Sequence, residues 1–157
     1  MKKAFEIFDT ILVVIILGFA LLMLVPRLFH ITPYVVMTSS MYPTIPAGSI
    51  CFIDEKDTEP EIEDVIAYKL STELITHRVV GIDENGNYIT QGDNNDAVDL
   101  APVTPGQVVG KNIFWVPVVG IIMTWVKTVP GIIVTISVLA VYLILSRVIM
   151  NRKDSWN

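Results

Sequence analysis

The sequence predicts a small, mainly β domain held between two transmembrane helices. The 157-residue chain is 52% hydrophobic, and its mean hydropathy of +0.58 is high for a soluble domain. This apolar excess is concentrated in two segments near the ends of the chain, while the residues between them form short β-like runs separated by turns. Together these observations favour a membrane-anchored β domain over a soluble one.

The first apolar segment covers residues 10–29, where Arg27 is the only charged residue. Because Met-Lys-Lys followed by an apolar run also opens secretory signal peptides, a cleaved leader is the alternative. Cleavage requires small residues after the apolar run, and the sequence VPRLFH at that place is bulky and basic. We therefore predict a transmembrane helix that is retained as an anchor, preceded by a tail at residues 1–9.

The second apolar segment covers residues 128–146, TVPGIIVTISVLAVYLILS, and contains no charge. At about 1.5 Å per residue a helix of this length covers roughly 28 Å, close to the hydrocarbon thickness of a bilayer. We predict a second transmembrane helix here, followed by a tail at residues 147–157.

Two spans place both tails on one side of the membrane. The tails hold five of the eleven basic residues of the chain, Lys2, Lys3, Arg147, Arg152 and Lys153. Because cytoplasmic flanks are enriched in Lys and Arg, we expect both termini in the cytoplasm. The protein is then a multi-pass protein of the cell membrane, with residues 30–127 on the extracytoplasmic side.

The intervening segment is acidic, with 13 acidic against 5 basic residues and a local charge near −8. This charge argues against a nucleic-acid partner, which favours clustered Lys and Arg. Its single cysteine, Cys51, cannot form an intramolecular disulfide, and between Ile50 and Phe52 it is expected to be a buried strand residue.

Five runs in this segment have the composition of β-strands, and no helix of ordinary length is expected among them. Asn85-Gly86 follows the third run and is a strong hairpin signal. Short strands over about a hundred residues predict a small β-barrel or a pair of packed sheets. The runs are residues 49–53, 65–68, 74–82, 87–91 and 108–113.

Residues 113–127, IFWVPVVGIIMTWVK, are too apolar for a loop in water and are interrupted by Pro117 and Gly120. Trp115 and Trp125 favour the headgroup layer of a membrane. We expect this segment to be an edge of the domain that rests on the bilayer; the alternative is a core strand followed by the start of a helix.

The stretch TSSMYPTIPAGS places three hydroxyl residues, Thr38, Ser39 and Ser40, just beyond the first apolar segment. A serine becomes an effective nucleophile only when a base takes its proton. Of the two histidines, His30 lies at the end of the apolar segment, where an interfacial role is expected. His77 lies within ITHRVVGI and, with an unperturbed pKa of about 6.5, is the natural base, although a histidine in a strand is ordinarily a half-buried structural residue.

A histidine base benefits from a carboxylate that fixes its tautomer. The loop QGDNNDAVDLAPV offers Asp93, Asp96 and Asp99. A solvated turn or a calcium loop are the alternatives, but the glycine and the closing glutamate of an EF-hand are absent. We therefore predict no metal site.

Four sequence blocks follow the first apolar segment in order: SSMYPTIPAG, EDVIAYKL, ITHRVVGI and ITQGDNNDAVD. In this order and spacing they resemble type I signal peptidase, over nearly the whole chain. The common bacterial branch has a lysine in the third block, where this chain has Thr76-His77-Arg78. The resemblance is therefore to the archaeal and endoplasmic-reticulum branch, also found in some Gram-positive bacteria, which uses serine, histidine and aspartate.

The resemblance implies that Ser40 is the nucleophile, His77 the general base and Asp99 the third member of the triad. Asp93 is the alternative third member. Thr38 corresponds to a donor to the oxyanion, together with the backbone N–H of Ser40. Two positions depart from the family pattern without removing a catalytic group: Ser39 and Glu63 each stand where glycine is usual.

The resemblance also implies a signal-peptidase-like fold and the removal of signal peptides from secretory preproteins with small residues at the P1 and P3 positions. Met41, Tyr42 and Ile45 are expected to line the substrate pockets, because they adjoin the nucleophile. No cofactor is needed, and accessory subunits are possible partners. The competing interpretation is a non-enzymatic, membrane-tethered β domain that binds a partner.

Overall fold

The structure of the chain is a computed structural model that describes residues 2–151. The end of the predicted tail at residues 147–157, beyond Asn151, lies outside the described residues, as does residue 1 of the predicted tail at 1–9. The chain divides into two compact units, one formed by residues 21–121 and the other by residues 1–20 and 122–157.

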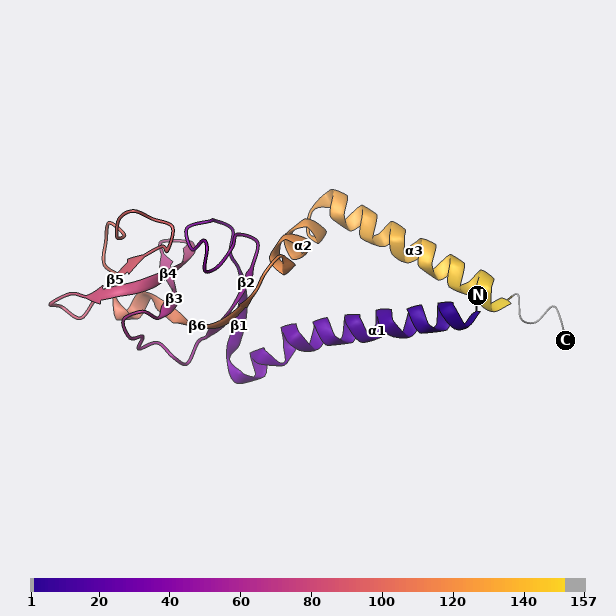
Figure 1. Cartoon of the computed structure of the whole chain (residues 1–157), viewed down its shortest axis with the longest axis horizontal. Helices are drawn as coiled ribbons and strands as arrows, with labels where there is room; N and C mark the ends of the chain where they lie inside the picture. Colours follow the sequence, from indigo (N-terminus) through magenta and orange to yellow (C-terminus); the bar gives the residue numbers. More distant parts are fainter. Residues whose placement is uncertain (1, 152–157) are drawn as a thin grey trace. The chain divides into compact units, whose positions relative to one another are not determined.

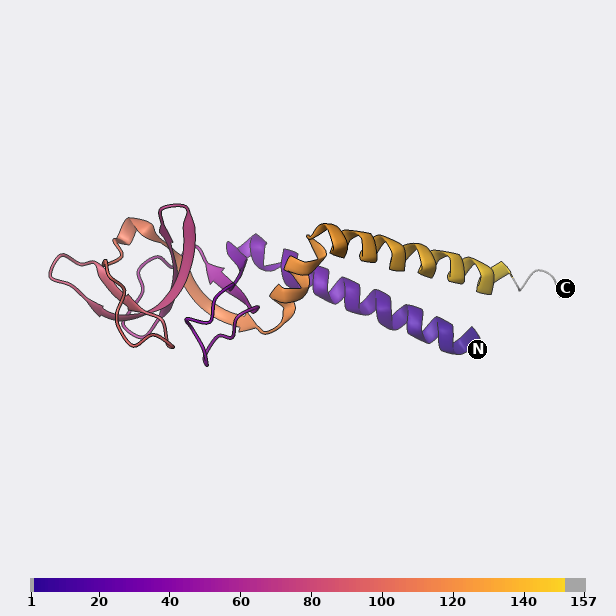
Figure 2. The same ribbon diagram turned by 90° about the horizontal axis from the view of Figure 1, so that it is seen from above.

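Residues 21–121 form a six-stranded antiparallel sheet in the order β1-β2-β6-β3-β4-β5, labelled in Figure 1 and seen from above in Figure 2. The prediction of a mainly β domain is confirmed, and each of the five predicted runs contributes a strand. The strands are β1 (Ile31–Val35), β2 (Ile50–Asp54), β3 (Val65–Leu70), β4 (Glu73–Ile82), β5 (Tyr88–Gln91) and β6 (Val108–Val116).

The first strand, β1, was not predicted from the sequence. It follows the apolar segment directly, so that its composition merges with the end of that segment. It also contains Pro33, which lacks the N–H of a ladder donor and is tolerated only at a sheet edge. In agreement with this rule, β1 is the outermost of the described strands and pairs with β2 alone among them.

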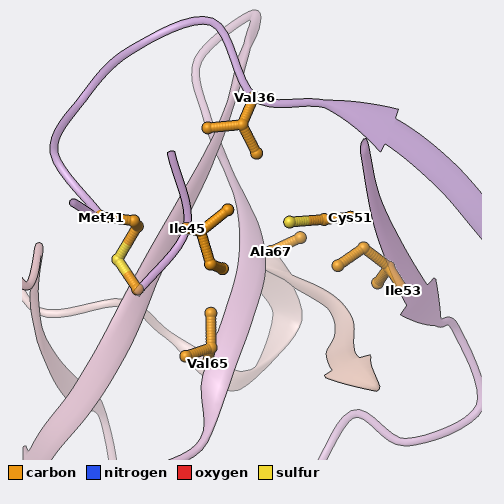
Figure 3. Close-up of a cluster of buried hydrophobic side chains, with 7 residues drawn as sticks. All are labelled: Val36, Met41, Ile45, Cys51, Ile53, Val65 and Ala67. Carbon is orange, nitrogen blue, oxygen red and sulfur yellow. The ribbon is translucent and has the colours of Figure 1, made fainter. Parts of the chain in front are cut away.

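The hydrophobic core contains two clusters of buried side chains. The first gathers residues from β2, β3 and the loop after β1: Val36, Met41, Ile45, Cys51, Ile53, Val65 and Ala67 (Figure 3). The second joins Ile66, Tyr68, Val79, Tyr88, Val103 and Val108. Burial of one such large side chain contributes about 1.5–3 kcal/mol. Cys51 is fully buried in β2, as predicted, and burial raises the pKa of its thiol to about 12.

The predicted hairpin at Asn85-Gly86 is confirmed between β4 and β5. Its turn spans five residues and is organised by Asp83, whose carboxylate accepts hydrogen bonds from the backbone N–H groups of Asn85 and Asn87, each at 2.8 Å. Gly86 has a φ of 79°, a conformation that glycine adopts without a steric cost.

The segment at residues 113–127 follows the alternative expectation, a strand followed by a helix, and the helix is short. Its first residues complete β6, and α2 (Val119–Val126) follows after the break at Pro117. The short 3₁₀ helix η2 (Pro105–Gln107) precedes β6, with a capping box between Thr104 and Gln107. Both helices were too short to be recognised from periodicity.

The other unit contains apolar helices. α1 (Lys2–Leu24) begins inside the tail predicted at 1–9 and ends before residue 29, where the 3₁₀ helix η1 (Pro26–Phe29) follows. α3 (Val129–Asn151) continues past the predicted end at 146.

Among the described residues, one helical segment, Glu6–Phe29, is by itself long and apolar enough to cross a membrane. The helices Val119–Val126 and Val129–Ile144 meet the same criterion only as a pair, which is bent by 91°. The hydroxyl of Tyr142 in α3 donates a hydrogen bond to Asp9 in α1.

Candidate active site

The predicted nucleophile, Ser40, lies in a turn that follows β1. The N–H of Ile45 donates to the carbonyl of Met41 at 2.7 Å and closes this turn. The side chains of Met41 and Ile45 are both fully buried in the core (Figure 3). Two buried apolar side chains therefore hold the turn that contains Ser40 against the core.

The main chain of Ser40 is held by the loop after β5. The N–H of Asn94 donates to the carbonyl oxygen of Ser40 at 2.8 Å. Gly92 approaches the same oxygen so closely that a β-carbon at this position would lie 2.6 Å from it. Only glycine allows this approach without a shift of the backbone.

The predicted base, His77, lies in β4 opposite Ile66 of β3, and its side chain is almost fully buried. Its Nδ1 lies 2.7 Å from Oδ2 of Asp99. The structure therefore brings together two of the three residues of the predicted triad by direct hydrogen bonding.

Asp99 is fixed by several further contacts. Its Oδ2 also accepts hydrogen bonds from the hydroxyls of Thr90 at 2.6 Å and Tyr68 at 3.0 Å. Its backbone N–H donates to the carbonyl of Thr90 at 2.8 Å. Partial burial, the largest influence, disfavours the charged form, but the hydrogen bonds from His77, Thr90 and Tyr68 outweigh it and hold the pKa of Asp99 below its usual value. An ionised Asp99 can only accept at this oxygen, so Nδ1 of His77 carries a proton, and in the neutral ring Nε2 is the acceptor.

Tyr68 and Thr90 contact Asp99 but were not predicted as site residues. Burial raises the pKa of Tyr68 to about 12, so its hydroxyl remains a donor throughout the neutral range. Both residues lie in predicted strands, and this position in the sequence indicated that they could be buried. Their common partner could not be foreseen, because it depends on which strands are neighbours.

Asp93, the alternative third member, pairs with Arg78, the residue that follows His77. Its two carboxylate oxygens accept from Nε and Nη2 of Arg78 at 2.9 and 2.7 Å, and Nη1 of the same arginine donates to the carbonyl of Glu63 at 2.7 Å. The hydrogen bond from Arg78 holds the pKa of Asp93 below its usual value. The structure thus assigns the two aspartates to two neighbours on β4, with Asp99 on His77 and Asp93 on Arg78.

Ser40 and His77 both line one cavity of about 480 Å³. Thr38, the predicted oxyanion donor, also lines it, and its Oγ1 lies 3.2 Å from Oγ of Ser40. Apart from Ser40 and Asn95, the lining comes from two segments, one beginning in β1 and one at the start of β4. The lining residues are Tyr34, Val35, Val36, Met37, Thr38, Ser40, Glu73, Leu74, Ile75, Thr76, His77 and Asn95.

The residues predicted to line the substrate pockets, Met41, Tyr42 and Ile45, are not among the residues that line this cavity. Met41 and Ile45 are fully buried in the core, where a peptide cannot reach them, and Tyr42 is 55% exposed but does not line the cavity. Adjacency to Ser40 was a poor guide because the turn directs the side chains of Met41 and Ile45 into the core. As to metals, no group of three or more His, Cys, Asp and Glu side chains suited to an ion occurs within residues 2–151.

Comparison with known proteins identifies the family. The family described as "Signal peptidase, peptidase S26" matches residues 8–98, more than half of the chain. The chain belongs to this family. The match ends one residue before Asp99, so the contact between His77 and Asp99 is an observation that the structure adds independently.

Three curated relatives illustrate the branch of the family. Signal peptidase I W of Bacillus subtilis (strain 168) is 35% identical over 85 residues, which are 50% of this chain and 45% of that protein. The signal peptidase complex catalytic subunit SEC11 of Eremothecium gossypii is 37% identical over 78 residues, 46% of this chain and 47% of that protein. The corresponding subunit of Dictyostelium discoideum is 25% identical over 127 residues, 72% and 71% of the two chains.

The chain spans about half the length of the first two of these curated relatives. The kinds of protein among these relatives confirm the branch indicated by Thr76-His77-Arg78. The relatives include a signal peptidase from a Gram-positive bacterium and SEC11 subunits.

Proposed function

We propose that this protein is a membrane-bound serine endopeptidase that removes amino-terminal signal peptides from secretory preproteins. The observation that carries the proposal is the hydrogen bond to Asp99 from His77, which lines the same cavity as Ser40. Membership of the signal peptidase family supplies the class of substrate.

In the proposed reaction, Nε2 of His77 accepts the proton of Ser40 Oγ as this oxygen attacks the scissile carbonyl carbon. The ionised Asp99 stabilises the imidazolium that forms and keeps the ring in the required tautomer. His77 then gives the proton to the leaving amine, and the carbon–nitrogen bond breaks to leave an acyl ester on Ser40. A water molecule, deprotonated by His77, hydrolyses this ester and restores the serine.

The negative charge on the attacked carbonyl oxygen requires donors. The backbone N–H of Ser40 and Oγ1 of Thr38 are the proposed pair, because the Thr38 hydroxyl is already within 3.2 Å of the nucleophilic oxygen. Loss of one such donor typically costs about 3 kcal/mol of transition-state stabilisation.

A substrate segment in extended form fits between two strand edges. Within the described sheet β5 pairs with β4 only from Arg78 onward, so the edge from Glu73 to His77 carries no neighbouring strand on that side. β1 pairs with β2 alone. These edges supply the two segments that line the cavity, and a peptide can add to them by β-augmentation, with backbone hydrogen bonds for affinity and pockets for alternate side chains. Small pockets then select small residues at P1 and P3.

The proposed setting is the cell membrane, crossed by two helices with both tails in the cytoplasm. Residues 30–127 form a small β-barrel or packed-sheet catalytic domain on the extracytoplasmic side, whose edge at 113–127 rests on the bilayer. A preprotein held by its own apolar helix diffuses in the same plane, which raises its effective concentration at an anchored site. Because some relatives are named as catalytic subunits of a signal peptidase complex, accessory subunits are proposed as further partners.

The decisive experiment is Ser40→Ala in the full chain, reconstituted in lipid and assayed on a preprotein with alanine at P1 and P3. We expect complete loss of processing with an unchanged circular dichroism spectrum. Ser39→Ala is the matched control, since it changes the neighbouring hydroxyl, and should retain activity. Full activity of Ser40→Ala would instead favour the alternative, a tethered β domain that binds a partner without cleaving it.

A further inference from the structure

The cavity has a charged residue at the end away from the proposed nucleophile. Glu73 is the first residue of β4, four positions before His77, and it lines the same cavity as Ser40. It is the one carboxylate among the lining residues, which are otherwise neutral or apolar apart from the titratable His77. Its side chain is exposed, and within the described part of the chain it forms no ion pair and no side-chain hydrogen bond. Its charge is therefore available to a ligand in the cavity.

We propose that Glu73 is a specificity residue that favours a basic side chain at P5, the fifth residue before the scissile bond. The inference rests on the proposed peptidase function and deepens it, because it concerns the same cavity and the same substrate.

The two cavity-lining segments define the direction of the substrate. One leads from Tyr34 toward Ser40, and the other leads from Glu73 to His77. The loop after β5 contacts both segments where they end. The N–H of its Asn94 donates to the carbonyl of Ser40, and its Asp93 pairs with Arg78, which follows His77. Ser40 and His77 thus lie at one end of the cavity, and Tyr34 and Glu73 at the other.

The register follows from strand geometry. Selection of small residues at P1 and P3 requires that the cavity receive the amino-terminal side of the cleavage site. A peptide extended along β4, with P1 at His77, advances about 3.3 Å per residue and reaches Glu73 after four further residues, at P5. Side chains of P1, P3 and P5 share one face of the peptide, as those of His77, Ile75 and Glu73 share one face of β4. In this alignment the Glu73 carboxylate therefore lies beside the P5 side chain of the peptide.

Because Glu73 is exposed to solvent, the preference that it can produce for a basic P5 side chain is limited. An exposed ion pair contributes about 0.2–1 kcal/mol, which corresponds to a preference of up to about five-fold in kcat/KM. Because exposed charges are screened by salt, the preference should decline as the ionic strength is raised from 0.02 to about 0.5 M.

The test uses the full chain in lipid and a peptide series that differs only at P5, with Lys, Gln or Glu. For the wild type we expect kcat/KM to fall in the order Lys, Gln, Glu, by two- to five-fold at each step. Glu73→Gln should remove the difference between the three peptides, and Glu73→Lys should reverse their order. Glu84→Gln, which removes the same charge in the turn between β4 and β5, outside the cavity lining, should leave the preference unchanged.

A lysine scan from P7 to P2 fixes the register. A preference that depends on Glu73 and is confined to P4–P6 supports the proposal, whereas one confined to other positions overturns it. A wild-type enzyme that cleaves all three peptides at equal rates, or a preference that survives in Glu73→Gln, also overturns it. Failure of the wild type to cleave any peptide would contradict the proposed function itself, which separates the two results.

Discussion

Nδ1 of His77 lies 2.7 Å from Oδ2 of Asp99, a residue 22 positions further along the chain. The same oxygen receives the hydroxyls of Thr90 and Tyr68, so three donors from three strands converge on it. This arrangement fixes the orientation of the imidazole in the absence of substrate, as the proposed role of His77 as a general base requires.

Asp99→Asn should reduce kcat by about three to four orders of magnitude, the effect expected when the histidine is held in the wrong tautomer. The amide nitrogen can donate to Nδ1, which then leaves the proton on Nε2, where it blocks the removal of the serine proton. Steady-state cleavage of a peptide substrate measures the effect. Asp96→Asn serves as the control, since this neighbouring aspartate is exposed in the same loop and should keep kcat within a few-fold. An Asp99→Asn enzyme with nearly full kcat would contradict the assigned role.

Acidification should destabilise the domain through Asp93 and Asp99. Both carboxyl groups have pKa values below the usual range in the folded protein, so the unfolded chain binds more protons at low pH. Their stabilising contribution is complete above the unfolded pKa of about 3.9 and is lost as the pH falls below it, toward the lower folded values. The thermal midpoint of the full chain in detergent should therefore fall between about pH 5 and 3. In Asp93→Asn the midpoint at pH 7 should be lower and the decline shallower; an unaltered slope would exclude this carboxylate as a cause.

Gly92→Ala should lower kcat, because the added β-carbon would lie 2.6 Å from the carbonyl oxygen of Ser40 and must displace the nucleophile turn. Misplacement of a reacting group by about 1 Å can cost about 100-fold in rate. Gly106→Ala is a matched control, because a β-carbon there meets no atom within 4 Å. Equal activity of the two variants would show that the close approach at Gly92 does not position the serine.

Arg78→Lys should destabilise the domain by about 1–3 kcal/mol, since lysine keeps the charge but cannot form the paired hydrogen bonds to Asp93 and the bond to the carbonyl of Glu63. A double-mutant cycle with Asp93→Asn, measured by denaturant unfolding, isolates the coupling between the two side chains. Strict additivity of the two substitutions would contradict a direct interaction.

Tyr142→Phe should weaken the association of α1 with α3, because it removes the hydroxyl that donates to Asp9. Hydrogen bonds between apolar helices in a membrane contribute about 0.6–2 kcal/mol. Unfolding of the reconstituted protein with a denaturing detergent measures the loss, and Ser146→Ala, whose hydroxyl bonds within its own helix to Leu143, is the control. The prediction fails if both variants unfold at the same detergent fraction.

The sequence by itself determined the features that depend on neighbours along the chain. Apolar runs at both ends predicted helices, alternation and turn residues predicted five of six strands, and Asn85-Gly86 predicted the hairpin. Four ordered blocks were enough to indicate the family and its His-containing branch. Each of these signals is local, since it arises from the period of a strand or helix or from the conformational preference of single residues.

The tertiary structure alone decided which residues meet. It placed β1 at the edge of the sheet, assigned Asp99 rather than Asp93 to His77, and turned Met41 and Ile45 into the core. Tyr68 and Asp99 are 31 positions apart, and nothing in the residues between them encodes that contact. Strand order, burial and the lining of a cavity depend on how distant segments pack. In this chain that packing, rather than any local pattern, determines which aspartate bonds to His77. It also forms the cavity that Ser40 lines.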